Sequence, residues 1–274
     1  MINEIPMVLT IACATLRRKW ISLVTFAVGA CLFQYLLITT YPAIGGAAAV
    51  NSVVRTIPPA LRRLLKIAPN LQASFDIRDY IALGFFHPVF LGLGSAFVVA
   101  RAADALAGEI EHGAIYLVLS RPIRRWVLVV GKLLEMLGGA GIIALLSWFG
   151  TATGVWTDSL PHRIPLTPYF LIALNAWALF GALGCGVFVM SSVSHRTAQV
   201  AGLGTTCILL AFVADILPAT SEPPVALFNP WHHYDPPAIV STGLLSSTSI
   251  ALLVGWIIAA SAVTIGLFAH RDLD

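Results

Sequence analysis

Charge is what this sequence has least of. Asp, Glu, Lys and Arg make up 11% of its 274 residues, whereas 58% are hydrophobic and the mean hydropathy is +0.87. Soluble domains carry about a quarter charged residues, so this chain has too few charges to cover a globule in water. The composition excludes a water-soluble enzyme.

Paired cysteines and a nucleotide-binding loop are also lacking. The four cysteines are scattered, without the CxxC or CxxH spacing of zinc and redox sites. The one Gly-Lys pair, Gly131-Lys132, is not a P-loop, because Trp126 replaces its first glycine and Leu133 replaces the Ser or Thr that would bind magnesium. We therefore expect the chain itself to bind no metal and no cofactor.

What the sequence does contain is six long apolar runs. A membrane-spanning helix needs about 20 mostly apolar residues, and four of these runs contain no Asp, Glu, Lys or Arg. The sequence therefore predicts an all-α integral membrane protein, with residues 1–274 as one transmembrane domain. The predicted spans are 21–41, 80–100, 126–156, 168–193, 199–217 and 250–269.

Basic residues predict the orientation. Ten of the 16 Lys and Arg residues lie on the side of the predicted membrane that holds both termini. Because cytoplasmic segments are enriched in these residues, we expect both termini in the cytoplasm of a multi-pass plasma-membrane protein. Residues 101–125 would also be cytoplasmic, and residues 42–79 and 218–249 external.

Three segments are expected to lie at the membrane surfaces. Residues 1–19 predict an interfacial helix, because apolar residues recur on one face and basic residues close its end. Residues 58–68 predict an amphipathic helix that lies either on the outer membrane surface or on the protein's own outer end. The six prolines in 218–249 exclude one continuous helix there and predict broken half-helices.

The connection 101–125 is too polar for lipid and too apolar for a solvated linker. Leu106, Ile110 and Leu117 form an apolar stripe at helical spacing. Gly113 interrupts this pattern, and Ser120 is expected to cap a new helix. We therefore expect helix, bend and helix, with the stripe covered by something other than lipid.

The same connection carries a motif. The stretches GEIEHG at 108–113, LVLSRP at 117–122 and GK at 131–132 resemble the signature of permease subunits in the type 2 family of ATP-binding cassette exporters. The closing FAHRDL at 268–273 is similar to the end of that family's chains, and residues 59–80 resemble its external amphipathic stretch. Ala114 stands where Thr is common, and Ile123 to Trp126 replace the usual Ser-Arg.

The resemblance implies an exporter subunit with a coupling helix seated in a cleft of a separate ATPase, which would bind the ATP and Mg. It further implies a second permease copy or paralogue, contact with membrane lipid, and no nucleic-acid partner. The two carboxylates of the motif would pair with basic or amide groups of the ATPase, while spans one and five of opposite subunits, near Phe33 and Ile208, would form the dimer contact. The coupling residues would be Glu109, Glu111, His112, Gly113, Ser120, Arg121 and Pro122.

Aromatic and polar residues within the spans are candidates for lining a transport pathway. Such a lining suits a hydrophobic or amphiphilic substrate, such as a drug, lipid or secondary metabolite. His87, which precedes Pro88, either satisfies backbone groups freed by a kink or lines the pathway. The candidates are Phe33, Tyr35, Phe86, His87, Phe90 and Asn175.

Other charged residues predict structural roles. Glu135 is expected to pair with Lys132, three residues earlier on the same helix. Asp215 is expected to cap the outer end of its span. His232 and His233, with Asp235 nearby, have no third ligand at a convincing spacing for a metal.

Two other classes of function remain open. An intramembrane protease or lipid transferase is one, although Glu111-His112 has no second histidine four residues on. A membrane scaffold without energy coupling is the other. We expect a transport subunit that is not itself an enzyme.

Overall fold

The computed structural model describes residues 4–56, 58, 76–120, 123–157, 164–217 and 225–272. Within this part of the chain the regular structure is helical throughout. Six helical segments are long and apolar enough to cross a membrane, and they match the predicted spans to within a few residues at most ends, which confirms the all-α integral membrane fold. These segments are Trp20–Ala43, Ile77–Glu111, Arg125–Thr157, Thr167–Val193, Thr197–Ile216 and Ser247–Ala269.

The spans form a bundle with α10 (Thr167–Val193) in its centre. Helix α10 contacts α9 (Arg125–Thr157), α6 (Pro88–Ala103) and α14 (Ser247–Ala269). It is apolar all round, as a helix surrounded by other helices must be. Within its most apolar stretch of 18 residues, 78% is buried inside the protein. The corresponding share is 17% for α11 (Thr197–Ile216) and for α14, so these two helices lie at the edge.

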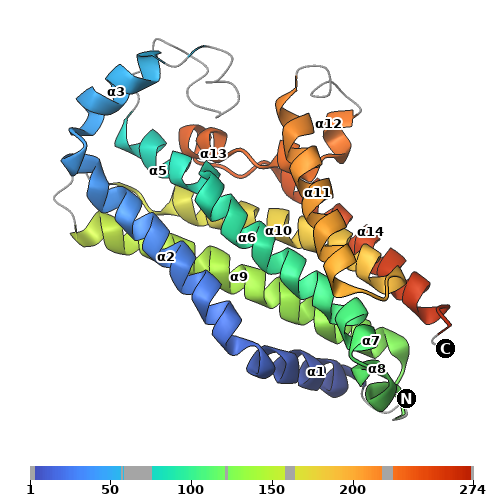
Figure 1. Cartoon of the computed structure of the whole chain (residues 1–274). Helices are drawn as coiled ribbons and strands as arrows, with labels where there is room; N and C mark the ends of the chain where they lie inside the picture. The colour runs from blue at the N-terminus through green and yellow to red at the C-terminus, as the bar shows by residue number, and fades with distance from the viewer. Residues whose placement is uncertain are drawn as a thin grey trace.

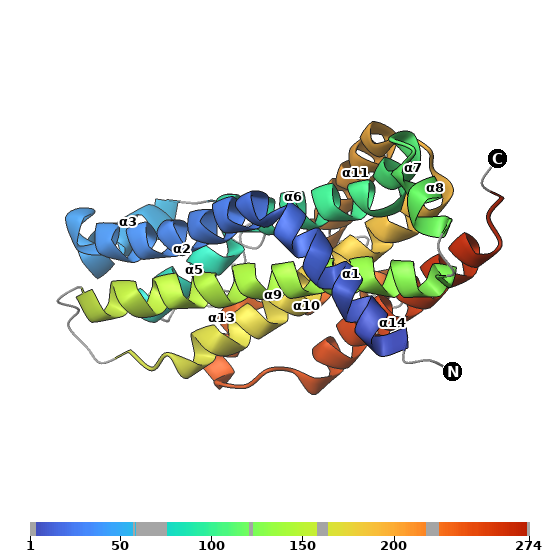
Figure 2. The same ribbon diagram turned by 90° about the horizontal axis from the view of Figure 1, so that it is seen from below.

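Helix α2 (Trp20–Ala43) packs along α9, and Figures 1 and 2 show the two helices side by side. Gly150 permits this contact. A Cβ atom at that position would overlap the backbone carbonyl oxygen of Cys31, which cannot move without moving α2. The bundle therefore depends here on the absence of a side chain.

The second span is divided at His87, between α5 (Ile77–Phe86) and α6. Pro88 occupies the first turn of α6, where its missing N–H costs nothing. The His87 ring accepts a hydrogen bond from the backbone N–H of Val89 at 3.2 Å, and Tyr234 donates to the freed carbonyl of Phe85 at 2.8 Å. His87 thus fulfils the first of its two predicted alternatives, satisfying backbone at the break.

Both chain ends lie at one end of the bundle, together with α7 (Glu109–Glu111) and α8 (Ala114–Leu119), as Figure 1 shows. We call this the termini-bearing end. The predicted N-terminal helix is α1 (Glu4–Arg18), which meets α2 at an elbow visible in Figure 2 and packs on α9 through buried Val8. This helix is therefore anchored to the protein as well as exposing the apolar residues Ile5 and Leu9.

The opposite end, the far end, holds α3 (Gly46–Thr56), which the sequence did not predict. It also holds three short helices, α12 (Val225–Phe228), the 3₁₀ turn η2 (Pro230–His233) and α13 (Pro236–Thr242). The prediction of broken half-helices is confirmed. The predicted amphipathic helix at 58–68 falls almost wholly on 59–75, which lie outside the described residues.

Candidate functional site

The motif segment folds as predicted into helix, bend and helix. Gly113 separates α7 from α8 with φ of 70°, in the left-handed region where a side chain is strained. The Gly113 N–H donates to the carbonyl of Ile110 at 3.0 Å. The turn therefore requires glycine and sets the direction of α8 relative to α7.

A π-helical turn, η1 (Asp104–Gly108), joins α6 to α7. Ser191, on α10, inserts its hydroxyl here, accepting hydrogen bonds from the N–H groups of Leu106 at 3.3 Å and Ala107 at 3.0 Å. The same hydroxyl donates to the carbonyl of Ala103 at 3.2 Å. One serine on the central helix thus stabilises an irregular backbone, of the kind found often at functional positions.

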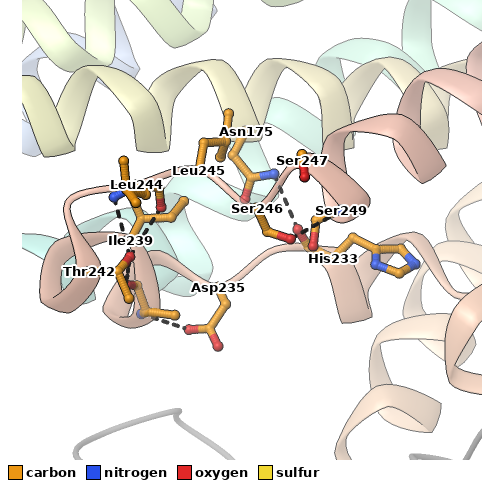
Figure 3. A pocket seen from close by; sticks show the side chains of 11 residues that line it. Asn175, His233, Asp235, Ile239, Thr242, Leu244, Leu245, Ser246, Ser247 and Ser249 are labelled. Carbon is orange, nitrogen blue, oxygen red and sulfur yellow. Dashed lines mark hydrogen bonds between the residues drawn. The ribbon is translucent and has the colours of Figure 1, made fainter.

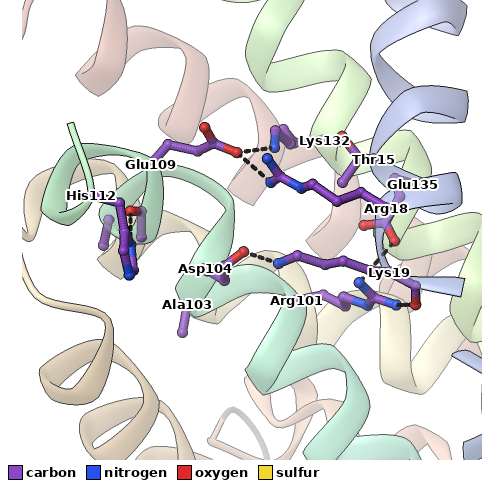
Figure 4. A network of polar contacts seen from close by, with 12 residues as sticks. Thr15, Arg18, Lys19, Arg101, Ala103, Asp104, Glu109, His112, Lys132 and Glu135 are labelled. Carbon is purple, nitrogen blue, oxygen red and sulfur yellow. Dashed lines mark hydrogen bonds and ion pairs between the residues drawn. The ribbon is translucent and has the colours of Figure 1, made fainter. Parts of the chain in front are cut away.

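Glu109 anchors α7 to two other helices, as Figure 4 shows. Its carboxylate accepts hydrogen bonds from Lys132 of α9 and Arg18 of α1, each at 2.7 Å. Glu109 is 7% exposed, so this is a buried charge with two cationic partners. Removing one partner from such a group typically costs several kcal/mol.

A second set of ion pairs extends the cluster to the α1–α2 elbow (Figure 4). Lys19 pairs with Asp104 of η1. Arg101 donates to the carbonyl of Lys19 at 2.9 Å, and its guanidinium lies 3.5 Å from the carboxylate of Glu135. Burial and the neighbouring cations, Arg101 first, lower the pKa of Lys19 to about 8, and the nearby carboxylate of Glu135 opposes this lowering.

Two sequence predictions are wrong here. Lys132 does not pair with Glu135, because Glu109 from the motif segment reaches Lys132 and leaves Glu135 to Arg101. The carboxylate of Glu109 does not face outward toward a partner, because the chain's own Arg18 and Lys132 occupy it. Three-residue helical spacing could not reveal either partner, since both belong to other helices.

The apolar stripe is also divided. Leu106 and Ile110 are buried in the chain's own core, whereas Leu117 is 75% exposed and Tyr116 is 46% exposed. The stripe as a whole is therefore not a docking face. Among the described residues, the outward surface of the motif segment includes Glu111 and His112 together with these two residues of α8.

The remaining described motif residues have partners within the chain. Glu111 accepts a hydrogen bond from the N–H of Thr197 at 2.8 Å, at the start of α11. The His112 ring donates to the carbonyl of Gly108 at 2.7 Å. Ser120 donates back to Leu117 at 2.9 Å, so it closes α8 instead of capping the next helix as predicted. Arg121 and Pro122 lie outside the described residues.

A clamp that sequence reasoning missed joins the chain's C-terminal segment to the bundle. Arg125, at the start of α9, donates to the carbonyls of Phe268 and Ala269 at 3.3 Å and to that of Arg271. Arg271 in turn donates to the carbonyls of Ser192 at 2.7 Å and Ser194 at 2.9 Å. The FAHRDL motif marked this segment as part of the family resemblance. It did not predict that Arg125 and Arg271 would donate hydrogen bonds to these backbone carbonyls.

Most of the six candidate pathway residues pack within the protein. Phe90 is wholly buried and packs against Phe85 and Phe180. Phe86 is buried against Tyr234, and the ring centroids of Phe33 and His87 lie 5.0 Å apart. Tyr35 is partly exposed on α2.

Asn175 is the candidate that lines a cavity. It donates a hydrogen bond to the carbonyl of His233 at 3.2 Å and faces a far-end cavity of about 410 Å³. A second cavity, of about 260 Å³, lies between α6 and α11 and is mostly apolar. Pro88, Ser95 and Trp231 are among its lining residues.

The far-end histidines have partners of their own. His232 lies 3.2 Å from the carboxylate of Asp215, and the His233 ring donates to the carbonyl of Leu227 at 3.0 Å. Among the residues that the structure describes, no three metal-ligating side chains gather into one group. Asp215 thus contacts the loop that follows its helix.

Six apolar spans, with an exposed motif-bearing turn fixed by buried ion pairs at the termini-bearing end, are the architecture of a multi-pass membrane protein. The comparison with known families makes this specific: residues 13–273 match the ABC-2 family transporter protein family, and the chain belongs to that family. A comparison with curated proteins found no match. The chain is therefore a transmembrane subunit of an ATP-binding cassette transporter, and its family implies pairing with an ATP-binding cassette ATPase.

Proposed function

We propose that this chain is the membrane subunit of an exporter that moves a hydrophobic or amphiphilic substrate, using ATP hydrolysed with Mg by a separate ATPase subunit. The termini-bearing end would face the cytoplasm, at the plasma membrane. The observation that carries the proposal is the turn at Gly113, which exposes α8 while Glu109 holds α7 in the bundle.

The docking face would be the outward side of this turn. Tyr116 and Leu117 supply exposed apolar area, and Glu111 and His112 lie beside them. Apolar anchors with polar neighbours are typical of protein interfaces. Glu111 would add little binding energy by itself, because exposed ion pairs are worth about 0–1 kcal/mol.

The buried ion pairs would transmit movement from this face to the spans. A push on α8 reaches α7 through one turn, and Glu109 links α7 to α1 and α9. Asp104 links the same segment to the α1–α2 elbow through Lys19. Helix α1 and the α1–α2 elbow would therefore move with the motif segment, in addition to α6 and α9, which it joins covalently.

Assembly would bring two such chains together through α2 of one and α11 of the other. Both helices expose large apolar residues, among them Leu32 and Leu36 on α2 and Leu209 and Leu210 on α11. Ile208, the predicted contact, is only 7% exposed and its carbonyl accepts a hydrogen bond from Trp231. The outward residues next to it are better placed for a contact between subunits.

The test is recovery of the ATPase subunit with the purified membrane subunit after co-expression. Leu117→Asp places a charge at the proposed docking face and should release the ATPase. Leu244→Asp is the matched control, because Leu244 is 72% exposed at the far end, and it should leave recovery unchanged. Full recovery with Leu117→Asp would contradict the proposed face.

A further inference from the structure

The far-end cavity is lined by residues of α10, η2 and α13, of the turn before α14 and of the start of α14, as the close view in Figure 3 shows. Asn175 comes from the central helix α10, Ile239 from α13, and Ser246 from the turn before α14. Its volume of about 410 Å³ falls within the roughly 300–1,000 Å³ of small-molecule sites. The far end therefore has room for a ligand.

A buried acceptor in this cavity is unsatisfied. Asn175 is 1% exposed, and while its amide nitrogen donates to the His233 carbonyl, its side-chain oxygen has no hydrogen-bond partner. A buried polar atom without a partner costs about 1–3 kcal/mol. Such an atom at a cavity is available to accept a hydrogen bond from a donor outside the chain, either water or a ligand.

The described part of the lining has one charged side chain, and it is an anion. Asp235 lies at the rim, where one carboxylate oxygen caps α13 by accepting from the N–H of Ala238 at 3.2 Å. Among the residues that the structure describes, neither Lys nor Arg lines the cavity, and the His233 ring is engaged with Leu227. The charge balance thus favours a cation over an anion.

The same cavity also has an apolar part. Ile239, Leu244 and Leu245 line it beside the polar residues. A ligand that fits would carry a positively charged donor at one end and an apolar body at the other. The serine and threonine hydroxyls of the lining can both donate and accept hydrogen bonds.

We propose that this cavity binds the primary ammonium headgroup of an amphiphile, with Asp235 supplying the counter-charge and Asn175 the buried acceptor. The proposal deepens the proposed function, since it names the class of substrate at the far end. It is tested on the isolated chain, without an ATPase, so its failure and that of the docking face are distinguishable.

The experiment measures binding of three probes of equal chain length to the protein in lipid nanodiscs, by calorimetry, with empty nanodiscs as the partition blank. Decylammonium has both charge and N–H donors, decyltrimethylammonium has charge alone, and decanol has no charge. We expect decylammonium to bind about tenfold more tightly than decyltrimethylammonium. The quaternary probe has no N–H group, so it cannot form the hydrogen bond between a charged donor and the buried acceptor. Decanol should bind more weakly than either.

Two variants assign the effect to the named residues. Asn175→Leu should abolish the difference between the primary and quaternary probes. Asp235→Asn should abolish the advantage of the two cations over decanol, while an Asn side chain still caps α13. The controls are Gln34→Leu, a buried amide on α2, and Asp272→Asn, an exposed carboxylate at the termini-bearing end; both should leave all three affinities unchanged.

The unmodified protein alone decides the question even if a variant fails to fold. Equal binding of all three probes would overturn the proposal and leave Asn175 as a residue satisfied by water. Persistence of both differences in Asn175→Leu and Asp235→Asn would overturn it as well, because the probes would then bind elsewhere.

Discussion

At the scale of single residues, the sequence located the important carboxylates but not their partners. Glu109 and Glu111 are two positions apart in one motif, yet Glu109 is buried between Arg18 and Lys132 while Glu111 lies at the surface. Helical spacing predicts neighbours on the same helix. It contains no information on which residue of a distant helix will arrive, so the pairing of Lys132 required the fold.

This difference predicts unequal effects of two similar substitutions. Glu109→Ala leaves Lys132 buried without a counter-charge and should cost about 3–5 kcal/mol, lowering the midpoint of thermal unfolding in detergent. Glu111→Ala should change that midpoint little. The double variant Glu109→Leu with Lys132→Met removes both charges and should recover most of the loss. Equal midpoints for the two single variants would contradict the buried ion pair.

Ser191 gives a second prediction at this scale. Ser191→Ala removes the acceptor for two buried N–H groups of the π-helical turn, at about 1–3 kcal/mol for each unsatisfied group. Amide hydrogen exchange across 104–111 should become faster. Ser192→Ala is the control, because the Ser192 hydroxyl bonds locally to Val189. Unchanged amide hydrogen exchange in Ser191→Ala would show that the π-helical turn is stable without the Ser191 hydroxyl.

At the scale of helices, the six spans could be predicted because length and apolar composition determine them directly. The break at His87 and the bend at Gly113 were also readable, since proline and glycine act on their own backbone. The π-helical turn was not, because it depends on Ser191 from another helix. Helix α3 was missed as well, because it follows closely on a span and has no separate apolar run of span length.

Close packing of α2 on α9 gives the prediction at this scale. Gly150→Ala should destabilise the protein, since the added methyl group overlaps the Cys31 carbonyl. Gly138→Ala, on the same helix, meets open space and should be neutral or stabilising by about 0.5–1 kcal/mol. The midpoints of thermal unfolding of the two variants in detergent are compared. Loss of stability in both would mean that glycine is needed for the geometry of α9 itself and not for its contact with α2.

At the scale of the whole molecule, composition, motif and span count were sufficient to reach the family, and the match over residues 13–273 confirms it. The residues that line the transport pathway could not be predicted in the same way. Aromatic residues such as Phe90 satisfy a pathway pattern and a core pattern equally, and only the packing around Phe90 assigns it to the core.

The dimer is predicted at this scale. Cysteines introduced at Leu36 and Leu210, in a variant without the four native cysteines, should cross-link between subunits in native membranes. A matched pair at Leu36 and Ile258, which is exposed on α14, should not. Cross-linking of the second pair alone would place α14 rather than α11 at the contact.

The central claim is that the exposed turn at the termini-bearing end receives the ATPase, and site-specific cross-linking of the co-expressed complex tests it most directly. A photoactivatable probe attached to a cysteine at Leu117, in the variant without native cysteines, should capture the ATPase subunit. The same probe at Leu244, equally exposed at the far end, should not. Capture from position 244, or an intact complex with no capture from position 117, would contradict the account.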